Sequence, residues 1–589
     1  MHAKLHRHAL LASAGKSALR LLRRIGWAPA SRFQRHYQRW IEAYDTHGEH
    51  ELIQLRDTVL ALPRTPRISV IVPVYNTSAQ YLVGMIESVR AQVYPHWELC
   101  LADDASNAPH VAVILQDYAQ QDPRVRVVLR PSNGHISAAS NSALALATGE
   151  YVALLDHDDL LPPHALVMAV KYLNAHPGAR LFYSDEDKVS FDGKRHSPYF
   201  KPDWDSELIV QQNFFCHLGI YDLQLVRSVG GFRVGFEGSQ DHDLILRCLR
   251  EVGETAIVHI PHVLYHWRSI EGSTAAGIEQ KPYATSAAWS AVVDHLNDDG
   301  VDAEVRPPTT AFPFVKISYP LPPRFPSVRL VIESFGDTAA LKRCIREFLS
   351  GTDYPALGIT LVTAKGHRAG DEFDKALRDL RPDVAWSRTS SLDQAIVECD
   401  EEYVCLLNEG MGAGSADWLT HLMRYAIRPG IGLSGAKLCR PSGRLVASGL
   451  VRTSREHAVP GHVGAGRSDP GYFGLNLLTR SVSALPAMGV VAKRSTFLSV
   501  RKHAWYTKHG WERGVVLSNV IEEMGLRCVL ASGVILICGR GASGLELKKS
   551  PAAYLDAKFK DGSYNPNLSL RATGASFGLS FPPRIDRFQ

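Results

Sequence analysis

Short apolar runs alternate with helix-like segments over the first half of the chain. Residues 68–74 read ISVIVPV, a continuous apolar run typical of a strand that is buried on both faces. Further strands are expected at 98–102, 126–129 and 151–155, and helices at 79–90, 111–119 and 137–146. This βαβαβαβ order predicts an α/β domain with a Rossmann-like, mostly parallel sheet.

The same pattern returns in the second half. Residues 328–335 (VRLVIESF) repeat the apolar pattern of 68–75 (ISVIVPVY), and residues 402–410 (EYVCLLNEG) align with 150–158 (EYVALLDHD). A Pro-rich stretch, 306–326, separates the two regions and is typical of a linker. We therefore predict an internal duplication of one α/β unit.

Five parts follow from this organisation of the 589 residues. They are a basic, amphipathic helical segment at 1–62, a first α/β domain at 63–305, a Pro-rich linker at 306–326, a second α/β domain at 327–545 and a C-terminal tail at 546–589. The tail is polar and shows no clear period, so we expect it to pack across the surface.

Positive charge is concentrated at the beginning of the chain. The first 40 residues hold nine Lys and Arg residues and no acid, which leaves 56 bases against 60 acids in the rest. Without a distributed basic face, nucleic-acid binding is not expected. Apolar residues between Leu11 and Ile25 recur at helical spacing opposite basic ones. Such a helix either lies on an anionic membrane surface or packs on its own domain, and the pattern leaves both open.

Cysteine usage and hydropathy bear on the compartment. The chain has nine cysteines and no CxxC pair, so neither a zinc ribbon nor a disulfide framework is indicated. No apolar run approaches the ~18 residues that a membrane-spanning helix needs. We expect a cytoplasmic protein, with peripheral attachment to the inner face of the cytoplasmic membrane through residues 1–40 left open.

Carboxylates follow two of the expected strands. Asp103 and Asp104 come after the second strand, and Asp156, Asp158 and Asp159 come after the fourth. Ligands of open α/β sheets bind beyond the carboxyl ends of the strands. The Asp156-x-Asp158 pair places two side chains on one side, where they can share a hard divalent cation, Mn²⁺ or Mg²⁺. Solvated loop acids or helix caps are the alternative.

A set of motifs then carries a resemblance to a known family. In order they are VIVPVYN at 70–76, the Asp103-Asp104 pair, GEY at 149–151 leading into LLDHDD, VGGF at 229–232 and SQDHD at 239–243. Over about residues 66–275 the chain resembles family 2 inverting glycosyltransferases of the GT-A fold, particularly bacterial enzymes of O-antigen and surface-polysaccharide assembly. The resemblance implies a nucleoside-diphosphate sugar donor and a glycan or lipid-linked glycan acceptor for metal-dependent hexosyl or deoxyhexosyl transfer.

The resemblance also implies roles for individual residues. Donor-binding residues would be Pro73, Tyr75, Asp104, Asp156 and Asp158, with Asp104 at the base and Asp156 on the ribose or nucleotide side. Asp158, Asp156 and His266 would hold the metal ion, and Asp241 would be the catalytic base. Acceptor-binding candidates are Asp185, Trp204, Asn213, Gly231 and Gln240. The residues alone leave structural roles open, such as a strand end at Pro73 or a helix cap at Asp241.

The second half lacks the acids of the first. Aligning the two halves places Ala364 and Lys365 opposite Asp103 and Asp104, Asn408 opposite Asp156, Gly410 opposite Asp158, Arg513 opposite Asp241 and Cys538 opposite His266. The apolar frame persists, so we predict a degenerate, non-catalytic second glycosyltransferase-like domain.

Two other function classes share some of these features. A nucleotidyltransferase would share the sheet and the acidic site, but VPVYNTS after the first strand has neither the glycine nor the lysine of a phosphate-binding loop. A non-catalytic glycan-binding scaffold would suit the second half better than the first.

Overall fold

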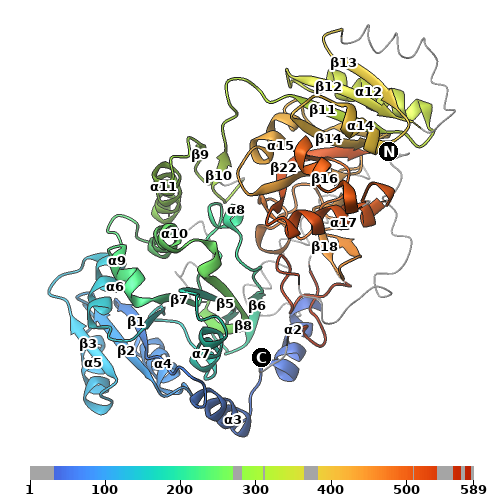
Figure 1. Ribbon diagram of the computed structural model, residues 1–589. Coiled ribbons are helices and arrows are strands. Elements are labelled where there is room, and N and C mark those ends of the chain that lie inside the picture. Colours follow the sequence, from blue (N-terminus) through green and yellow to red (C-terminus); the bar gives the residue numbers. More distant parts are fainter. Residues whose placement is uncertain are drawn as a thin grey trace, which may run out of the picture.

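The computed structural model in Figure 1 describes residues 32–269, 282–309, 312–363, 382–503, 505–508, 510–539, 561–571 and 577–585. It begins with helices α2 (Arg32–Tyr44) and α3 (Glu49–Leu60). The expected helical N-terminal segment is therefore present from Arg32 on, and the expected interfacial helix around Leu11 to Ile25 lies outside the described residues. Among the described helices, none has the length and apolar character needed to cross a membrane.

The first half contains one eight-stranded sheet. Its strands are β1 (Ile68–Val74), β2 (Trp97–Asp103), β3 (Val125–Leu129), β4 (Tyr151–Leu154), β5 (Leu181–Val189), β6 (Arg195–Tyr199), β7 (Gly219–Asp222) and β8 (Ile257–Arg268). The order is β3-β2-β1-β4-β7-β5-β6, and β8 pairs with β5. Strand β1 is parallel to β2 and β4, whereas β7 is antiparallel to β4 and β5. The predicted α/β class is confirmed, with antiparallel pairs in the second part of the sheet.

Helices lie between these strands in the sequence, and one more follows β8. They are α4 (Ala79–Arg90), α5 (Pro109–Gln121), α6 (His135–Leu146), α7 (Ala165–Ala175), α8 (Ser206–Ile209), α9 (Leu223–Ser228), α10 (Gln240–Val252) and α11 (Pro282–Asp298). In α4, Ser78 caps the N-terminus and the buried residues Leu82, Met85, Ile86 and Val89 recur at helical spacing. All seven residues of β1 are buried, as its unbroken apolar run predicts.

The second half repeats this topology. Its elements are β11 (Val328–Glu333), α12 (Thr338–Ser350), β12 (Leu357–Val362), β13 (Ala385–Thr389), α14 (Leu392–Glu398), β14 (Tyr403–Asn408), β15 (Met411–Ala413), α15 (Trp418–Ala426), β16 (Ile431–Cys439), β17 (Leu445–Ala447), β18 (Leu450–Arg452), β19 (Ala458–Pro460), β20 (Arg480–Ser481), β21 (Val490–Lys493), α16 (Arg494–Ser499), α17 (Gly510–Glu523) and β22 (Arg527–Cys538). The strand order β13-β12-β11-β14-β21-β16 matches β3-β2-β1-β4-β7-β5, and β22 is parallel to β16 as β8 is to β5. The predicted duplication is confirmed.

The two halves pack against each other, with the short hairpin of β9 (Glu304–Arg306) and β10 (Lys316–Ser318) between them (Figure 1). Across the boundary the rings of Tyr199 and Phe473 stack with centroids 3.9 Å apart. The hydroxyl of Tyr472 donates to the carbonyl of Pro198 at 2.7 Å and accepts from the amide of Phe200 at 2.9 Å. One cluster of buried apolar residues contains side chains from both halves, so they share a core.

The C-terminal tail ties the two halves together. Asp561 accepts a hydrogen bond from the amide of Arg452 in the second half, while Asn565 donates to Asp185 in the first. The carbonyl of Gly562 accepts from the amide of Asp203 at 2.9 Å. Asp561 and Asn565 are buried, which the polar composition of the tail did not reveal.

Candidate functional site

A small pocket lies at the carboxyl ends of β1 and β4, and we call it the edge pocket. Its lining includes Pro73 from β1, Asp156 after β4, His217 before β7, and Gln240 and Asp241 at the start of α10. Four of the residues predicted from the sequence therefore come together here. They meet because parallel strands end at the same edge of the sheet and α10 begins beside it.

The negative charge of Asp156 is destabilised by its surroundings in the edge pocket. Burial raises the pKa of its carboxyl group, and the neighbouring charges of Asp158 and Asp241 raise it further, while His217 lowers it. The nearest Asp156 oxygen lies 4.0 Å from Nε2 of His217. A bound cation would relieve this crowding of negative charge.

The third acid of the loop fixes the other two. Asp159 is fully buried and accepts hydrogen bonds from the hydroxyl of Tyr265 at 2.6 Å and from the amide of Arg268 at 2.7 Å. These bonds tie the loop to β8. Among the described residues, none forms a hydrogen bond or ion pair with the carboxylate of Asp158, which is half-buried beside Asp156. Two such carboxylates fit the oxygen ligands that Mg²⁺ and Mn²⁺ prefer.

His217 belongs to the site, and the sequence reasoning missed it. Its ring stacks on Tyr265 with centroids 4.5 Å apart, and its ligand atom lies within 4.8 Å of those of Cys216 and Asp241. Its Nδ1 is buried without a hydrogen-bond partner in the described part of the chain. The available signal was a single histidine inside the apolar run FFCHLGIY, which precedes a buried strand.

His266 does not reach the edge pocket. Its Nδ1 lies 2.6 Å from Asp187 Oδ1, and the preceding residue, Tyr265, faces Asp159 instead. Successive side chains of a strand point to opposite faces, so Tyr265 and His266 contact residues on opposite sides of β8. The structure thus brings His217, and not the predicted His266, to Asp156.

Asp241 and Asp243 differ in what they face. Asp243 is 1% exposed and is held by Arg247 at 2.6 Å and by Nε of Arg233 at 2.8 Å. Asp241 lines the edge pocket and accepts a hydrogen bond from Nδ2 of Asn213 at 3.2 Å. Of the two acids, only Asp241 is placed to take a proton from a bound hydroxyl group.

The remaining donor-site candidates lie along the same edge of the sheet. Pro73 pairs with Ala102 in the parallel register, and Tyr75, just beyond β1, is 43% exposed. Asp104 is 2% exposed, and its Oδ1 accepts from the amide of Gly134 at 3.0 Å. In this state Asp104 therefore anchors the loop that leads into α6.

Three of the five acceptor candidates have structural surroundings instead. Asp185 is fully buried and binds His259 and Asn565 at 2.9 Å each. Trp204 lines the cavity between the two halves. Gly231 has a φ of +69°, and a Cβ there would lie 2.5 Å from an oxygen of Asn141.

Asn213 and Gln240, the other two acceptor candidates, do lie next to Asp241. Asn213 donates to its carboxylate, and Gln240 lines the edge pocket. Gln240 also closes the preceding turn, since its Oε1 accepts from the amide of Gly238 at 2.8 Å.

The corresponding edge of the second half is filled by its own side chains. Val328 pairs with Tyr403 as Ile68 pairs with Tyr151, which places Asn408 and Gly410 where the first half has Asp156 and Asp158. Asn408 is 4% exposed. Glu333, at the position of Pro73, forms an ion pair with Arg513 from α17.

Two of the expected correspondences shift by one residue. The register of β11 with β12 places Thr363 at the position of Asp103, while Ala364 and Lys365 lie outside the described residues. The pairing of β5 with β7 and of β16 with β21 makes Cys439 the counterpart of Asp187. Asp187 pairs with His266 on β8, and Cys439 pairs with Ile537 on β22. Ile537, rather than Cys538, therefore takes the place of His266. The irregularities in these two strand pairs fall at different points, which a residue count along the sequence does not detect.

Comparison with known proteins finds a domain match in the first half and relatives that match most of the chain. Residues 69–228 match the model of the glycosyl transferase family 2 domain. An uncharacterized protein of Sinorhizobium fredii is 41% identical over 76% of this chain and 50% of its own length. The O-antigen biosynthesis protein RfbC of Myxococcus xanthus is 32% identical over 88% of this chain and 41% of its own. The chain thus spans half or less of these relatives.

Solved structures show a weaker likeness. Staphylococcus aureus TarS in complex with UDP-GlcNAc is 20% identical with a TM-score of 0.33, over 39% of this chain and 67% of that chain. Residues 69–228, which include Asp156 of the edge pocket, are thus similar to the glycosyl transferase family 2 domain, and Asp241 lies just beyond the matched range.

Proposed function

We propose that the chain transfers a sugar, with inversion, from a nucleoside-diphosphate donor to a glycan acceptor of a bacterial surface polysaccharide. The observation that carries the proposal is the meeting of Asp156 and Asp241 in the edge pocket, with Asp158 beside them. Asp241 can accept a proton there, and Asp156 and Asp158 suit a cation that binds diphosphate.

Asp241 is the general base in this proposal. It stands at the second position of α10, where the helix dipole stabilises a carboxylate. The amide of Asn213 orients it, and the acceptor hydroxyl group loses its proton to it as the new glycosidic bond forms. A single in-line displacement needs no second carboxylate as nucleophile.

Asp156 and Asp158 would hold Mn²⁺ or Mg²⁺. When bound, the ion supplies positive charge for the departing diphosphate. His217, beside Asp156, adds a polar hydrogen-bonding group at the same position. Pro73, Tyr75 and Asp104 would border the nucleoside, since they line the neighbouring strand ends.

The nature of the acceptor rests on the relatives. A relative named for O-antigen biosynthesis supports a surface polysaccharide, and we propose a lipid-linked form of it. Attachment to an anionic membrane through residues 1–40 stays a prediction. The second half would be non-catalytic and would order the first half or bind glycan, because Asn408 and Gly410 replace its acids.

Product formation tests the base directly. The Asp241→Asn variant should lose transfer by about 10³-fold or more while it still binds the donor, because the amide cannot accept the proton. Glu251→Gln, an exposed change at the other end of α10, is the matched control and should keep full activity. Comparable turnover of Asp241→Asn and the control would overturn the assignment.

A further inference from the structure

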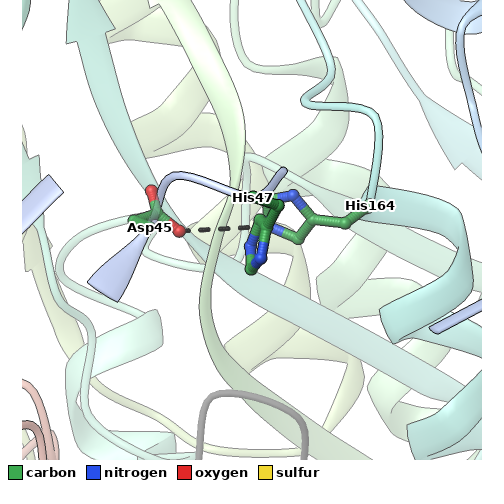
Figure 2. Close-up of side chains that lie close together, drawn as sticks. All are labelled: Asp45, His47 and His164. Carbon is green, nitrogen blue, oxygen red and sulfur yellow. Dashed lines mark ion pairs between the residues drawn. The ribbon is translucent and has the colours of Figure 1, made fainter. Parts of the chain in front are cut away.

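Two histidines and an aspartate that do not line the edge pocket meet where the N-terminal helices touch the first sheet domain. Asp45 follows α2, His47 lies in the connection to α3, and His164 immediately precedes α7. Figure 2 shows the two rings and the carboxylate turned toward one another. One ligand atom of each lies within 4.8 Å of the other two.

His164 is the least satisfied member of this cluster. It is 4% exposed, and neither of its ring nitrogens has a hydrogen-bond partner in the described part of the chain. Its Nε2 lies 4.0 Å from Asp45 Oδ1, which is too far for a hydrogen bond. Buried polar atoms are nearly always paired, so two unpaired nitrogens on one ring indicate a missing ligand.

Charged groups border the cluster. Arg195 forms ion pairs with both Asp45 and Asp187, so one guanidinium group is shared by two carboxylates, and a bound cation would share Asp45 with it. Imidazole nitrogens and a carboxylate oxygen are ligand atoms that divalent transition metals accept.

We propose that Asp45, His47 and His164 bind a divalent transition-metal ion, for which Zn²⁺ is the best match. Two imidazole nitrogens and one carboxylate oxygen are a common zinc ligand set, with water at the fourth position. Around a tetrahedral ion with bonds of ~2.0 Å, ligand atoms stand about 3.3 Å apart. The three ligand atoms, now within 4.8 Å of one another, would have to move closer by about 1.5 Å or less to bind one ion.

The site would be structural and separate from the sugar-transfer site. It joins the α2–α3 connection to the start of α7, and α2 itself packs Trp40 on Phe200 with centroids 5.2 Å apart. An ion there would fasten the N-terminal helices to the first domain. The harder Mn²⁺ or Mg²⁺ of the edge pocket prefers oxygen ligands, which distinguishes the two ions.

Metal content and cobalt spectroscopy of the full chain test the proposal. Metal-stripped protein is loaded with Zn²⁺, freed of excess ion by gel filtration and analysed by elemental analysis, and a Co²⁺ titration is followed by visible absorbance. The parent chain should retain about one Zn²⁺. His47→Gln and His164→Gln should weaken binding at least tenfold. His50→Gln, an exposed histidine on α3, is the matched control and should bind as the parent does.

Asp158→Asn separates this site from the edge pocket and should leave zinc retention and the cobalt spectrum unchanged. Zinc should also raise the Tm of the parent chain but not that of His47→Gln, which settles the matter if His164→Gln fails to fold. Unchanged binding in His47→Gln would overturn the proposal. Loss of zinc in Asp158→Asn with retention in His47→Gln would equally overturn it, because the ion would then belong to the edge pocket.

Discussion

At the scale of single residues, the edge pocket is defined by how its charges are balanced. Asp156 has a raised pKa because its half-buried carboxyl group is partly removed from water and lies near two other carboxylates. Asp243, only two positions from Asp241, is neutralised by Arg247 and Arg233. A carboxylate without a close internal counter-ion, such as Asp156, can bind a cation or accept a proton, whereas Asp243 is already occupied by its ion pairs.

Cation binding should therefore depend on pH through Asp156. Its folded-state pKa is raised, so the proton is held to higher pH than by an ordinary aspartate, and Mn²⁺ competes with it. We predict that Mn²⁺ affinity falls as pH drops through this raised pKa, and that Asp156→Asn binds weakly with little dependence on pH. Calorimetric titration between pH 4.5 and pH 8 measures both. A pH-independent affinity in the parent chain would contradict the prediction.

His217 provides a second prediction at this scale. Its ring adjoins Asp156 and Asp241, so His217→Gln should lower kcat by about 10- to 100-fold with an unchanged Tm. His266→Gln should instead lower the Tm, because it removes one of the partners of the buried Asp187, and should change Mn²⁺ affinity less than twofold. Initial rates and thermal melts of the two variants decide between these histidines. The reverse pattern would restore His266 to the site.

Residue-level prediction from sequence succeeded where strand ends alone determine position. Pro73 and Asp156 follow apolar runs whose parallel pairing could be anticipated, so their meeting was predictable. His266 was misplaced because the face of a side chain depends on strand register. Asp185 was misplaced because its partner Asn565 lies 380 residues away.

At the scale of elements, β5 shows how an acidic run can be buried. Its Asp185, Glu186 and Asp187 are at most 7% exposed, and each faces a basic partner. Lys201 pairs with Glu186 at 3.1 Å, and His259 lies 2.9 Å from Asp185. A short acidic run usually indicates a solvated loop, and only the neighbouring strands and loops reveal this exception.

The His259 pair makes β5 and β8 sensitive to pH. Burial alone would lower the pKa of His259, but the contacts with Asp185 and Asp203 outweigh burial and raise the pKa to about 9. Because this pKa lies above the ordinary 6.5, protonated His259 stabilises the folded state fully below pH 6.5, and this contribution is lost as pH rises through about 9. His259→Gln should cost on the order of 3 kcal/mol at pH 6.

Thermal melts from pH 6 to pH 10 check the sign of this effect. The difference between the parent chain and His259→Gln should shrink as pH approaches 10. His196→Gln, on the neighbouring β6, is the control and should show no such narrowing. A difference that grows with pH would contradict the assigned direction.

At the scale of the whole molecule, buried polar residues join the two halves that the duplication produced. Glu207, 1% exposed, pairs with Arg428 and Arg527 of the second half, and Asp205 accepts from the amide of Ser481 at 2.7 Å. Repetition of the fold was predictable because apolar strands repeat in the sequence. The packing of the halves was not, since it rests on isolated polar residues and a tail without period.

Removal of Glu207 tests how firmly the halves are joined. Glu207→Ala leaves two partly buried guanidinium groups without their carboxylate, a loss on the order of 3–5 kcal/mol. We predict that the parent chain unfolds in one calorimetric transition and that this variant unfolds in two. Glu304→Ala, an exposed acid on β9, should leave the transition unchanged. One unaltered transition in Glu207→Ala would show that the halves do not depend on this contact.

The most direct test of the central claim is titration of the full chain with a panel of nucleoside diphosphates and their sugars, with and without Mn²⁺. We predict affinity for at least one of them that requires Mn²⁺ and that is lost in the double variant Asp156→Asn, Asp158→Asn. Binding that is indifferent to the ion, or that survives both substitutions, would contradict the claim that these carboxylates form the donor site.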